Sequence, residues 1–324
     1  MSRLFYLGNG QRQKSPSGTD TWGQNPDRRP EGYIAEPGLV NAVNVALLLH
    51  KPLLLTGEPG TGKSELAYSL AWEQGFTEVL KFETKSTSTA RDLLYSIDDV
   101  GRFKSTNNQA VLEFLTYAAL GKAILFANDE AAVSRYLTPR MVHGGKRRSV
   151  VLIDEVDKAP RDFPNDLLNE LDYFHFSVPE LGNEPVSADN DYRPIVVITS
   201  NSEKDLPDAF LRRCIYYNLP FPDRETLEKI VARRLGEFAG SSSALYKGAL
   251  DLFFQLRERS SQLRKIPATA ELLDWLLALR KCQNGGASVL TRKLVDKTLS
   301  SLVKTAEDQV KATVIVERWD SSRN

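Results

Sequence analysis

Five short apolar runs, each bounded by turn residues, mark the chain as far as residue 219. They are PLLL from residue 52, EVLKF from 78, VVLID from 150, IVVITS from 195 and CIYYNL from 214. Segments with helical spacing of apolar residues lie between them. Runs this apolar, without strict alternation, are typical of strands buried on both faces. The pattern therefore predicts an α/β fold, a mostly parallel sheet with helices on both faces.

After PFPDRET at residue 220 the strand signals stop. Four later segments space their apolar residues three and four apart, as amphipathic helices do. They are ETLEKIVARRLGEF, ALDLFFQLRER, TAELLDWLLALRK and LTRKLVDKTLSSLVKT. We expect a small α-helical domain over residues 222–324, following a first domain over residues 33–221. Its tail, VIVERWDSSRN, is compatible with an edge strand or with a frayed end.

Residues 8 to 32 are rich in Gly, Pro, Ser and charged side chains. This composition predicts an irregular arm over residues 1–32 rather than a packed element, so the globular part is expected to begin near Tyr33. Neither a signal sequence nor an apolar run near the roughly 18 residues that span a bilayer is apparent. These features favour a cytoplasmic protein with no membrane contact.

The phosphate-binding candidate is GEPGTGKS, Gly57 to Ser64, which fits G-x-x-x-x-G-K-[ST] between an apolar run and a helical pattern. Its glycines let backbone N–H groups point inward at a phosphate, and the following helix adds the positive end of its dipole. Lys63 would bridge the β- and γ-phosphates, and the Ser64 hydroxyl would bind Mg²⁺. The predicted nucleotide-binding residues are Gly57, Glu58, Pro59, Gly60, Thr61, Gly62, Lys63, Ser64 and Glu65.

Two acidic residues end the run SVVLIDEVDKAP. A nucleotide site needs a carboxylate for its metal and, for hydrolysis, a group that orients water. Asp154 would bind Mg²⁺ through its water shell, and Glu155 would polarise the attacking water. The alternative is a pair of acids that merely end a strand at the surface; the phosphate loop upstream favours the functional interpretation.

A third candidate lies in PIVVITSNSEKDLPDAFLRRC. Because parallel strands end at one edge, Asn201 is expected beside the phosphate loop, where it could contact the γ-phosphate or the water. A helix capped near Asp205, with Pro207 in its first turn, would end with Arg212 and Arg213, whose side chains leave the helix about 100° apart. One arginine could reach a neighbouring subunit's nucleotide while the other packs locally. The alternative is two solvated arginines.

Together these motifs resemble those of AAA+ ATPases in order and spacing, as Walker A, Walker B, sensor 1 and arginine finger. KPLLLTGEPGTGKSELAYSLA, VLIDEVDKAPRDFPNDLLNEL and TSNSEKDLPDAFLRRC closely resemble the MoxR branch over about residues 33–310. The resemblance implies a core of five parallel strands, a helical lid, and a ring, commonly a hexamer, with ATP at the subunit junctions. It also implies an insert at about residues 85–148 in the second core helix and a hairpin at about 173–194. The alternation in FHFSV independently supports the hairpin.

One departure concerns the lid arginine that senses the γ-phosphate in MoxR relatives. Ala270 stands at its position in RKIPATAELLDWL, and Arg264 or Lys265 could substitute, with Arg292 as a weaker candidate.

The function predicted is Mg²⁺-dependent ATP hydrolysis that remodels or activates a partner protein, such as one with a von Willebrand A domain. A nucleic-acid motor or restriction-type NTPase is a competing hypothesis. The equal numbers of basic and acidic residues, 42 each, argue against it. Lys146, Arg147 and Arg148 form a basic loop that could touch nucleic acid or remain a solvated connection. A third reading is a nucleotide-gated scaffold with little turnover.

Overall fold

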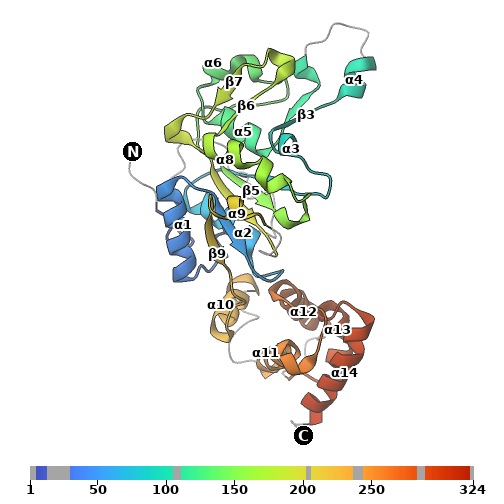
Figure 1. Ribbon diagram of the computed structural model, residues 1–324. Coiled ribbons are helices and arrows are strands. Elements are labelled where there is room, and N and C mark those ends of the chain that lie inside the picture. The colour runs from blue at the N-terminus through green and yellow to red at the C-terminus, as the bar shows by residue number, and fades with distance from the viewer. Residues whose placement is uncertain are drawn as a thin grey trace. The chain divides into compact units, whose positions relative to one another are not determined.

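A computed structural model describes residues 5–12, 30–104, 111–201, 206–235, 244–282 and 289–321 (Figure 1). The chain divides into two compact units. The second unit contains Glu58–Gly62 of the phosphate loop and Pro220–Asn324, and the first contains the remaining residues. Residues 13–29 of the predicted arm and the expected cap at Asp205 lie outside the described residues.

The first unit is built on five strands, and all of their pairings are parallel. The sheet order is β2-β5-β8-β1-β9. Every residue of β1, β5 and β8 is buried, which explains the unbroken apolar runs. The predicted α/β fold is therefore confirmed. The strands are β1 (Leu53–Thr56), β2 (Val79–Glu83), β5 (Val150–Asp154), β8 (Ile195–Thr199) and β9 (Ile215–Asn218).

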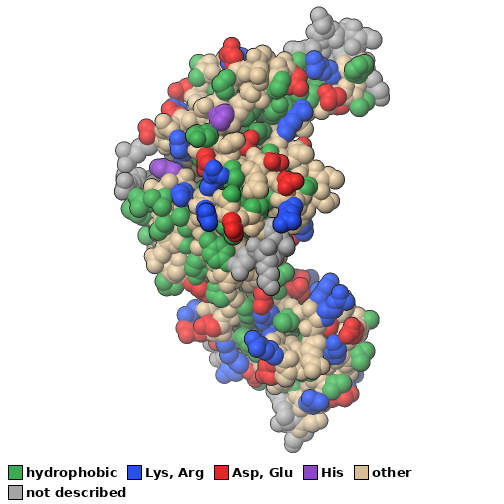
Figure 2. Space-filling view, in the orientation of Figure 1, with side chains coloured by type: hydrophobic (Ala, Val, Ile, Leu, Met, Phe, Trp, Pro, Cys, Tyr) green, Lys and Arg blue, Asp and Glu red, His purple; other side chains and the backbone are tan. Residues whose placement is uncertain are grey.

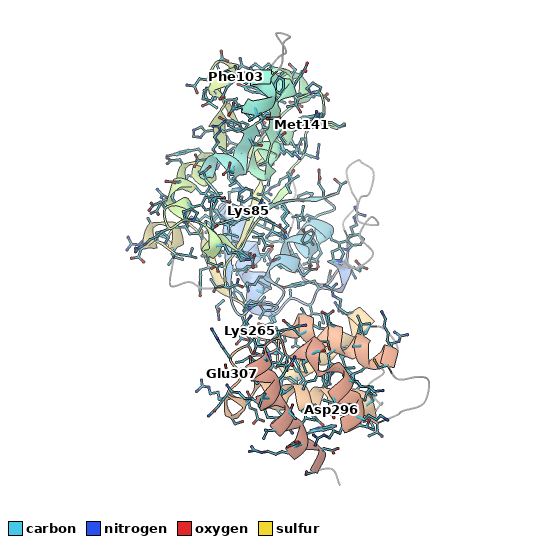
Figure 3. The ribbon with its side chains drawn as sticks, turned by 90° about the vertical axis from the view of Figure 1, so that its right-hand side faces the viewer. Lys85, Phe103, Met141, Lys265, Asp296 and Glu307 are labelled. Carbon is cyan, nitrogen blue, oxygen red and sulfur yellow. The ribbon has the colours of Figure 1, made fainter. Side chains whose placement is uncertain are left out.

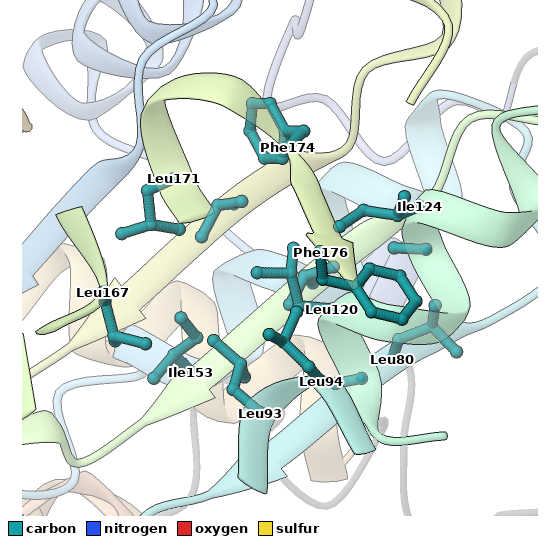
Figure 4. Packing of buried hydrophobic residues seen from close by; sticks show 14 of the residues in the cluster. Leu80, Leu93, Leu94, Leu120, Ile124, Ile153, Leu167, Leu171, Phe174 and Phe176 are labelled. Carbon is teal, nitrogen blue, oxygen red and sulfur yellow. The ribbon is translucent and has the colours of Figure 1, made fainter. Parts of the chain in front are cut away.

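Two apolar clusters cover the two faces of this sheet. On one face, alternate residues of the central strands pack against α1 (Pro37–Leu49) and α2 (Lys63–Glu73). On the other face, the intervening residues pack with α5 (Ala119–Phe126) and with Leu167, Leu171 and Phe176 (Figure 4). Burial on both faces fixes the register of the central strands, because a shift by one residue would exchange the two clusters.

Two small antiparallel sheets lie in the segments where insertions are expected. β3 (Tyr95–Ile97) pairs with β4 (Leu115–Tyr117), and β6 (His175–Ser177) pairs with β7 (Pro185–Ser187). In sequence, the first pair lies between the helix Ala90–Leu94 and the helix Ala119–Phe126, within the segment that joins β2 to β5. The short helices of the first unit are α3 (Ala90–Leu94), α4 (Asp99–Lys104), α6 (Glu130–Val133), α7 (Phe163–Asp166), α8 (Leu168–Tyr173) and α9 (Asp208–Leu211).

The second unit is helical, as its periodicity predicts. Trp275 is fully buried at its centre, and its indole N–H donates to Thr298 Oγ1 at 2.9 Å. None of the helices in the described ranges is long and apolar enough to cross a bilayer. The helices of this unit are α10 (Arg224–Leu235), α11 (Ala244–Arg257), α12 (Thr269–Cys282), α13 (Arg292–Leu302) and α14 (Ala306–Ser321).

The interpretation of the tail as an edge strand or a frayed end is wrong. The segment VIVERW lies inside α14. Ala312, Val316 and Trp319 are buried and follow one another at helical spacing. Packing of this face against the other helices therefore overrides the strand preference of the β-branched residues.

The arm is irregular where it is described, but the expectation that it is not packed is wrong for residues 5–12. These residues form neither helix nor strand. Tyr6 is fully buried in the cluster beneath α1 and α2, and its hydroxyl lies 2.9 Å from Ser69 Oγ. The packed core therefore begins well before Tyr33.

Glu73 at the end of α2 holds this segment in place. Its carboxylate accepts the backbone N–H groups of Leu7, Gly8 and Gly10 at 2.8, 3.0 and 2.7 Å. Gly10 has φ +75°, and a Cβ there would lie 2.2 Å from the Glu31 carbonyl oxygen. Only glycine suits this position.

Candidate functional site

The loop between β1 and α2 has a backbone that requires glycine. Gly57, Gly60 and Gly62 have φ of 141°, 76° and 92°. A Cβ on Gly57 would lie 2.4 Å from the Leu219 carbonyl oxygen. The loop thus curls where side chains do not fit, as expected for a phosphate cradle at the start of a helix.

Lys63 is the first residue of α2 and folds back over this loop. Its ammonium donates to the Gly57 carbonyl at 2.8 Å, and the residue is only 7% exposed. The Thr61 hydroxyl closes the turn by donating to the Glu58 carbonyl at 2.9 Å. The ammonium therefore lies at the helix N-terminus, where positive charge from both the helix dipole and the lysine favours a phosphate.

Asp154 ends β5 and lies at the centre of the polar cluster. Its Oδ1 accepts the hydroxyls of Ser64 at 2.6 Å and Thr199 at 2.7 Å, and its Oδ2 lies 3.0 Å from Lys81 Nζ. Burial raises the pKa of this carboxyl, but the donors from Ser64, Thr199 and Lys81 outweigh it and hold the pKa below its ordinary value. Asp154 is therefore a carboxylate at neutral pH.

Glu155 follows in a left-handed backbone conformation, with φ of 58°. Its backbone N–H donates to Thr199 Oγ1 at 2.9 Å, so Thr199 joins Asp154 and Glu155. The Glu155 carboxylate is half-exposed and forms an ion pair with Lys158. An exposed pair of this kind is weak and opens readily.

Asn201 follows β8, which lies between β5 and β1 in the sheet. Its backbone N–H donates to Asp157 Oδ1 at 3.1 Å. The strand order thus puts Asn201 at the same edge as Asp154 and the phosphate loop, the edge at which parallel sheets bind ligands.

The two arginines after α9 differ. Arg213 Nε lies 3.0 Å from Asp172 Oδ2 of α8. The Arg212 side chain is exposed and makes no hydrogen bond or ion pair with the residues that the structure describes. Pro207 precedes α9 as its N-cap instead of lying in its first turn. Of the two side chains, Arg212 is the one available to another molecule.

The substitutes considered for the lid arginine have structural contacts. The backbone N–H groups of Arg264 and Lys265 donate to Asp308 at 2.8 and 3.0 Å. Lys265 is labelled in Figure 3. Arg292 Nη2 lies 3.0 Å from Glu317. Arg292 is thus engaged within the helical unit, while the side chains of Arg264 and Lys265 are exposed.

Sequence reasoning missed Arg257, at the end of α11. Its guanidinium lies 3.3 Å from the centre of the Phe221 ring, donates to the Pro267 carbonyl and is 2.8 Å from Glu58 of the phosphate loop. All four residues belong to the second unit. A lone arginine at a helix end gives no sequence signal that it contacts the phosphate loop.

The basic loop is engaged with its own chain. Lys146 pairs with Asp189 at 2.8 Å, and Arg147 lies over the Phe126 ring at 3.6 Å. Arg148 Nε donates to the Arg193 carbonyl at 2.6 Å. On the face shown in Figure 2, basic and acidic side chains are interspersed. Each of these three basic side chains therefore contacts another part of its own chain.

The residues present fit a magnesium nucleotide. The Ser64 hydroxyl and the Asp154 carboxylate are hard oxygen donors, which Mg²⁺ prefers, and they lie 2.6 Å apart beside the glycine loop. A phosphate loop after β1, an acidic strand end on β5 and a polar strand end on β8 define a phosphate-loop nucleotide-binding protein.

Comparison with family models places residues 52–214, just over half of the chain, in the family described as AAA domain (dynein-related subfamily). The chain belongs to this family, whose members are generally nucleotide-binding ATPases. A search of curated protein sequences gave no match.

Two solved structures of Thermotoga maritima RuvB variants are similar to the chain. One is 14% identical, with a TM-score of 0.50 over 90% of this chain and 80% of its own. The other is 15% identical, with a TM-score of 0.47 over 86% and 74% of the two chains. At 14% identity, the structure with a TM-score of 0.50 shows a shared fold and nothing about function.

Proposed function

We propose that this chain is a Mg²⁺-dependent ATPase of the MoxR type, which forms a ring and uses ATP to remodel or activate a partner protein. The observation that supports it most is the convergence of Ser64, Asp154 and Thr199 within 2.7 Å at the mouth of a glycine loop. The resemblance of the flanking sequences to the MoxR branch supports the finer assignment.

Each residue of the site has a defined task in this reaction. Lys63 would bind the β- and γ-phosphates, and Ser64 and Asp154 would hold the cation, which would supply positive charge to stabilise phosphoryl transfer. Glu155 accepts the proton of the attacking water once its exposed ion pair with Lys158 opens. Asn201 orients that water or the γ-phosphate from the end of β8.

Arg212 completes the site of a neighbouring subunit. It is exposed and unpaired within the described ranges, whereas Arg213 is held by Asp172. An arginine supplied in trans can be worth about 10³ to 10⁵ in rate, so an isolated subunit is nearly idle. The ring, which we expect to be a hexamer, is therefore the active form.

The client is a protein in this proposal, in keeping with the MoxR resemblance, and a partner with a von Willebrand A domain is the first to test. We place the reaction in the cytoplasm. A nucleic-acid motor is disfavoured because the basic loop is engaged with its own chain and the net charge is zero. A nucleotide-gated scaffold remains the alternative suggested by Ala270 in place of a lid arginine.

The experiment that tests this function is the ATP hydrolysis rate per subunit over a wide range of protein concentration at saturating Mg²⁺. A rate that rises and then saturates indicates that subunits complete each other's sites. A constant, appreciable rate would contradict the trans arginine. Negligible turnover throughout, with ATP-dependent assembly, would favour the scaffold.

Mixing two inactive variants sharpens the test. Glu155→Gln removes the base in cis, and Arg212→Ala removes the group supplied in trans. A mixed ring contains sites with an intact Glu155 from one variant and an intact Arg212 from the other, so mixing restores turnover. Arg213→Ala is the matched control. Without a second variant in the mixture, it should retain activity if the role of Arg213 is only to hold α8.

A further inference from the structure

Lys81 lies on the edge strand β2 and reaches the carboxylate to which the proposed function assigns the cation. Its ammonium is 3.0 Å from Asp154 Oδ2 and 2.7 Å from Glu83 Oε1. Glu83 lies opposite Asp154 in the register of β2 and β5. Because residues two apart on a strand share a face, Lys81 and Glu83 both project toward Asp154.

The contact divides the two oxygens of Asp154 between different kinds of donor. Oδ1 accepts hydroxyls from Ser64 and Thr199, whereas Oδ2 faces an ammonium. A hydroxyl oxygen can itself ligate a cation, but an ammonium has no lone pair and only repels one. The side chain of Asp154 is 12% exposed and that of Lys81 is 28% exposed, so water screens this charge less than it would at an open surface.

We propose that Lys81 is a positioning residue that sets the affinity of the site for its divalent cation. It holds Oδ2 of Asp154 and places a fixed positive charge beside it. Glu83 acts in the opposite direction, because it shares the ammonium and adds negative charge near the cation. The inference rests on the proposed function, since it takes the cation to bind at Ser64 and Asp154.

Removing the charge of Lys81 and removing that of Glu83 should shift the affinity for the cation in opposite directions. Lys81→Met should tighten Mn²⁺ binding about fivefold, because a repelling charge a few ångströms from the metal is lost. Glu83→Gln should weaken Mn²⁺ binding about twofold, since the Glu83 side chain is 72% exposed and its charge is well screened. Lys81→Arg keeps the charge and should stay within about twofold of wild type.

Lys85→Met is the matched control. Lys85 (Figure 3) lies four residues further along the same segment, is exposed and forms no ion pair with the residues that the structure describes. The Lys85→Met substitution removes one positive charge, as Lys81→Met does, but it leaves the contacts of Asp154 unchanged. A shift below about 1.5-fold is expected, because exposed charges at longer range are largely screened.

The measurement is a Mn²⁺ titration of the full chain with a saturating non-hydrolysable ATP analogue, read by the electron paramagnetic resonance of bound Mn²⁺. The affinity for the analogue without metal is measured in parallel. The proposal expects Lys81→Met to change metal affinity and leave metal-free nucleotide affinity unaltered, which a general loss of structure would not do. If Lys81→Met does not fold, the sign of the Glu83→Gln shift decides.

The inference would be overturned if Lys81→Met bound Mn²⁺ as wild type does, or if Lys85→Met shifted the affinity as much as Lys81→Met. Either result would leave the proposed function standing. A wild-type chain that binds the analogue without any metal dependence would overturn the cation site and the inference together.

Discussion

A buried carboxylate lies at each end of α2: Asp154 of β5 contacts Ser64 near the start of the helix, and Glu73 is its last residue. The two carboxylates accept different kinds of donor. At the start of the helix, Asp154 accepts side-chain donors from Ser64, Thr199 and Lys81. At the end, Glu73 accepts three backbone N–H groups from the N-terminal segment.

The two carboxylates differ in whether their hydrogen-bond donors can be replaced by a cation. Side-chain hydroxyls can rotate and let a cation approach, whereas backbone donors are fixed by the path of the chain. The carboxylate with side-chain donors is suited to a reaction, and the one with backbone donors is suited to holding the fold.

The largest effect is expected for Asp154→Asn. The amide loses the charge that holds the cation, so ATP turnover should fall by at least about two orders of magnitude. Its oxygen can still accept a hydroxyl, so the fold should persist. Steady-state hydrolysis and thermal unfolding check this. A variant that hydrolyses normally but unfolds early would reverse the roles of the two ends.

Glu73→Ala should act on stability. It leaves the backbone N–H groups of Leu7, Gly8 and Gly10 without their acceptor, at a cost of about 3 kcal/mol in the free energy of unfolding. Urea denaturation gives the loss, and Glu73→Gln, which keeps an oxygen acceptor, should lose less. Affinity for a fluorescent ATP analogue should change less than about twofold; a tenfold loss would show that this end also shapes the nucleotide site.

Gly10→Ala tests the backbone path itself. The added Cβ would meet the Glu31 carbonyl at a φ of +75°, so about 2 kcal/mol of stability should be lost. Hydrogen exchange of the Gly8 and Leu7 amides measures local release of the segment. Unchanged protection would mean that the contact with Glu73 does not depend on this turn.

Tyr6→Phe should have the smallest effect. It removes the 2.9 Å contact between the Tyr6 hydroxyl and Ser69 while keeping the buried ring, so the loss should be about 1 kcal/mol. Adding Ser69→Ala removes the stranded hydroxyl, and the double variant should be no less stable than Tyr6→Phe. Additive losses would assign Ser69 another role.

The sequence was most informative where burial is complete. The strands β1, β5 and β8 are buried throughout and appear as unbroken apolar runs, and the motifs at their ends predicted that Ser64, Asp154 and Asn201 would share one sheet edge. Their roles in catalysis remain predictions.

Other features left a weaker trace. The contacts of Glu73 are with backbone N–H groups, which every residue but proline has, so no side-chain pattern marks them. Lys81 and Glu83 stand two residues apart in VLKFE, a spacing that many strands share, and only the pairing of β2 with β5 reveals that Asp154 is their neighbour. The tail shows the converse, since its β-branched residues favour a strand and helix packing decides otherwise.

The strand order also has a consequence for synthesis on the ribosome. β1 ends at Thr56, but its two neighbours in the sheet, β8 and β9, begin at Ile195 and Ile215. The strand that presents the phosphate loop therefore emerges long before either partner exists. Nascent chains that stop before Ile195 should be unable to bind ATP, and β1 is then an unpaired apolar segment that a chaperone can recognise.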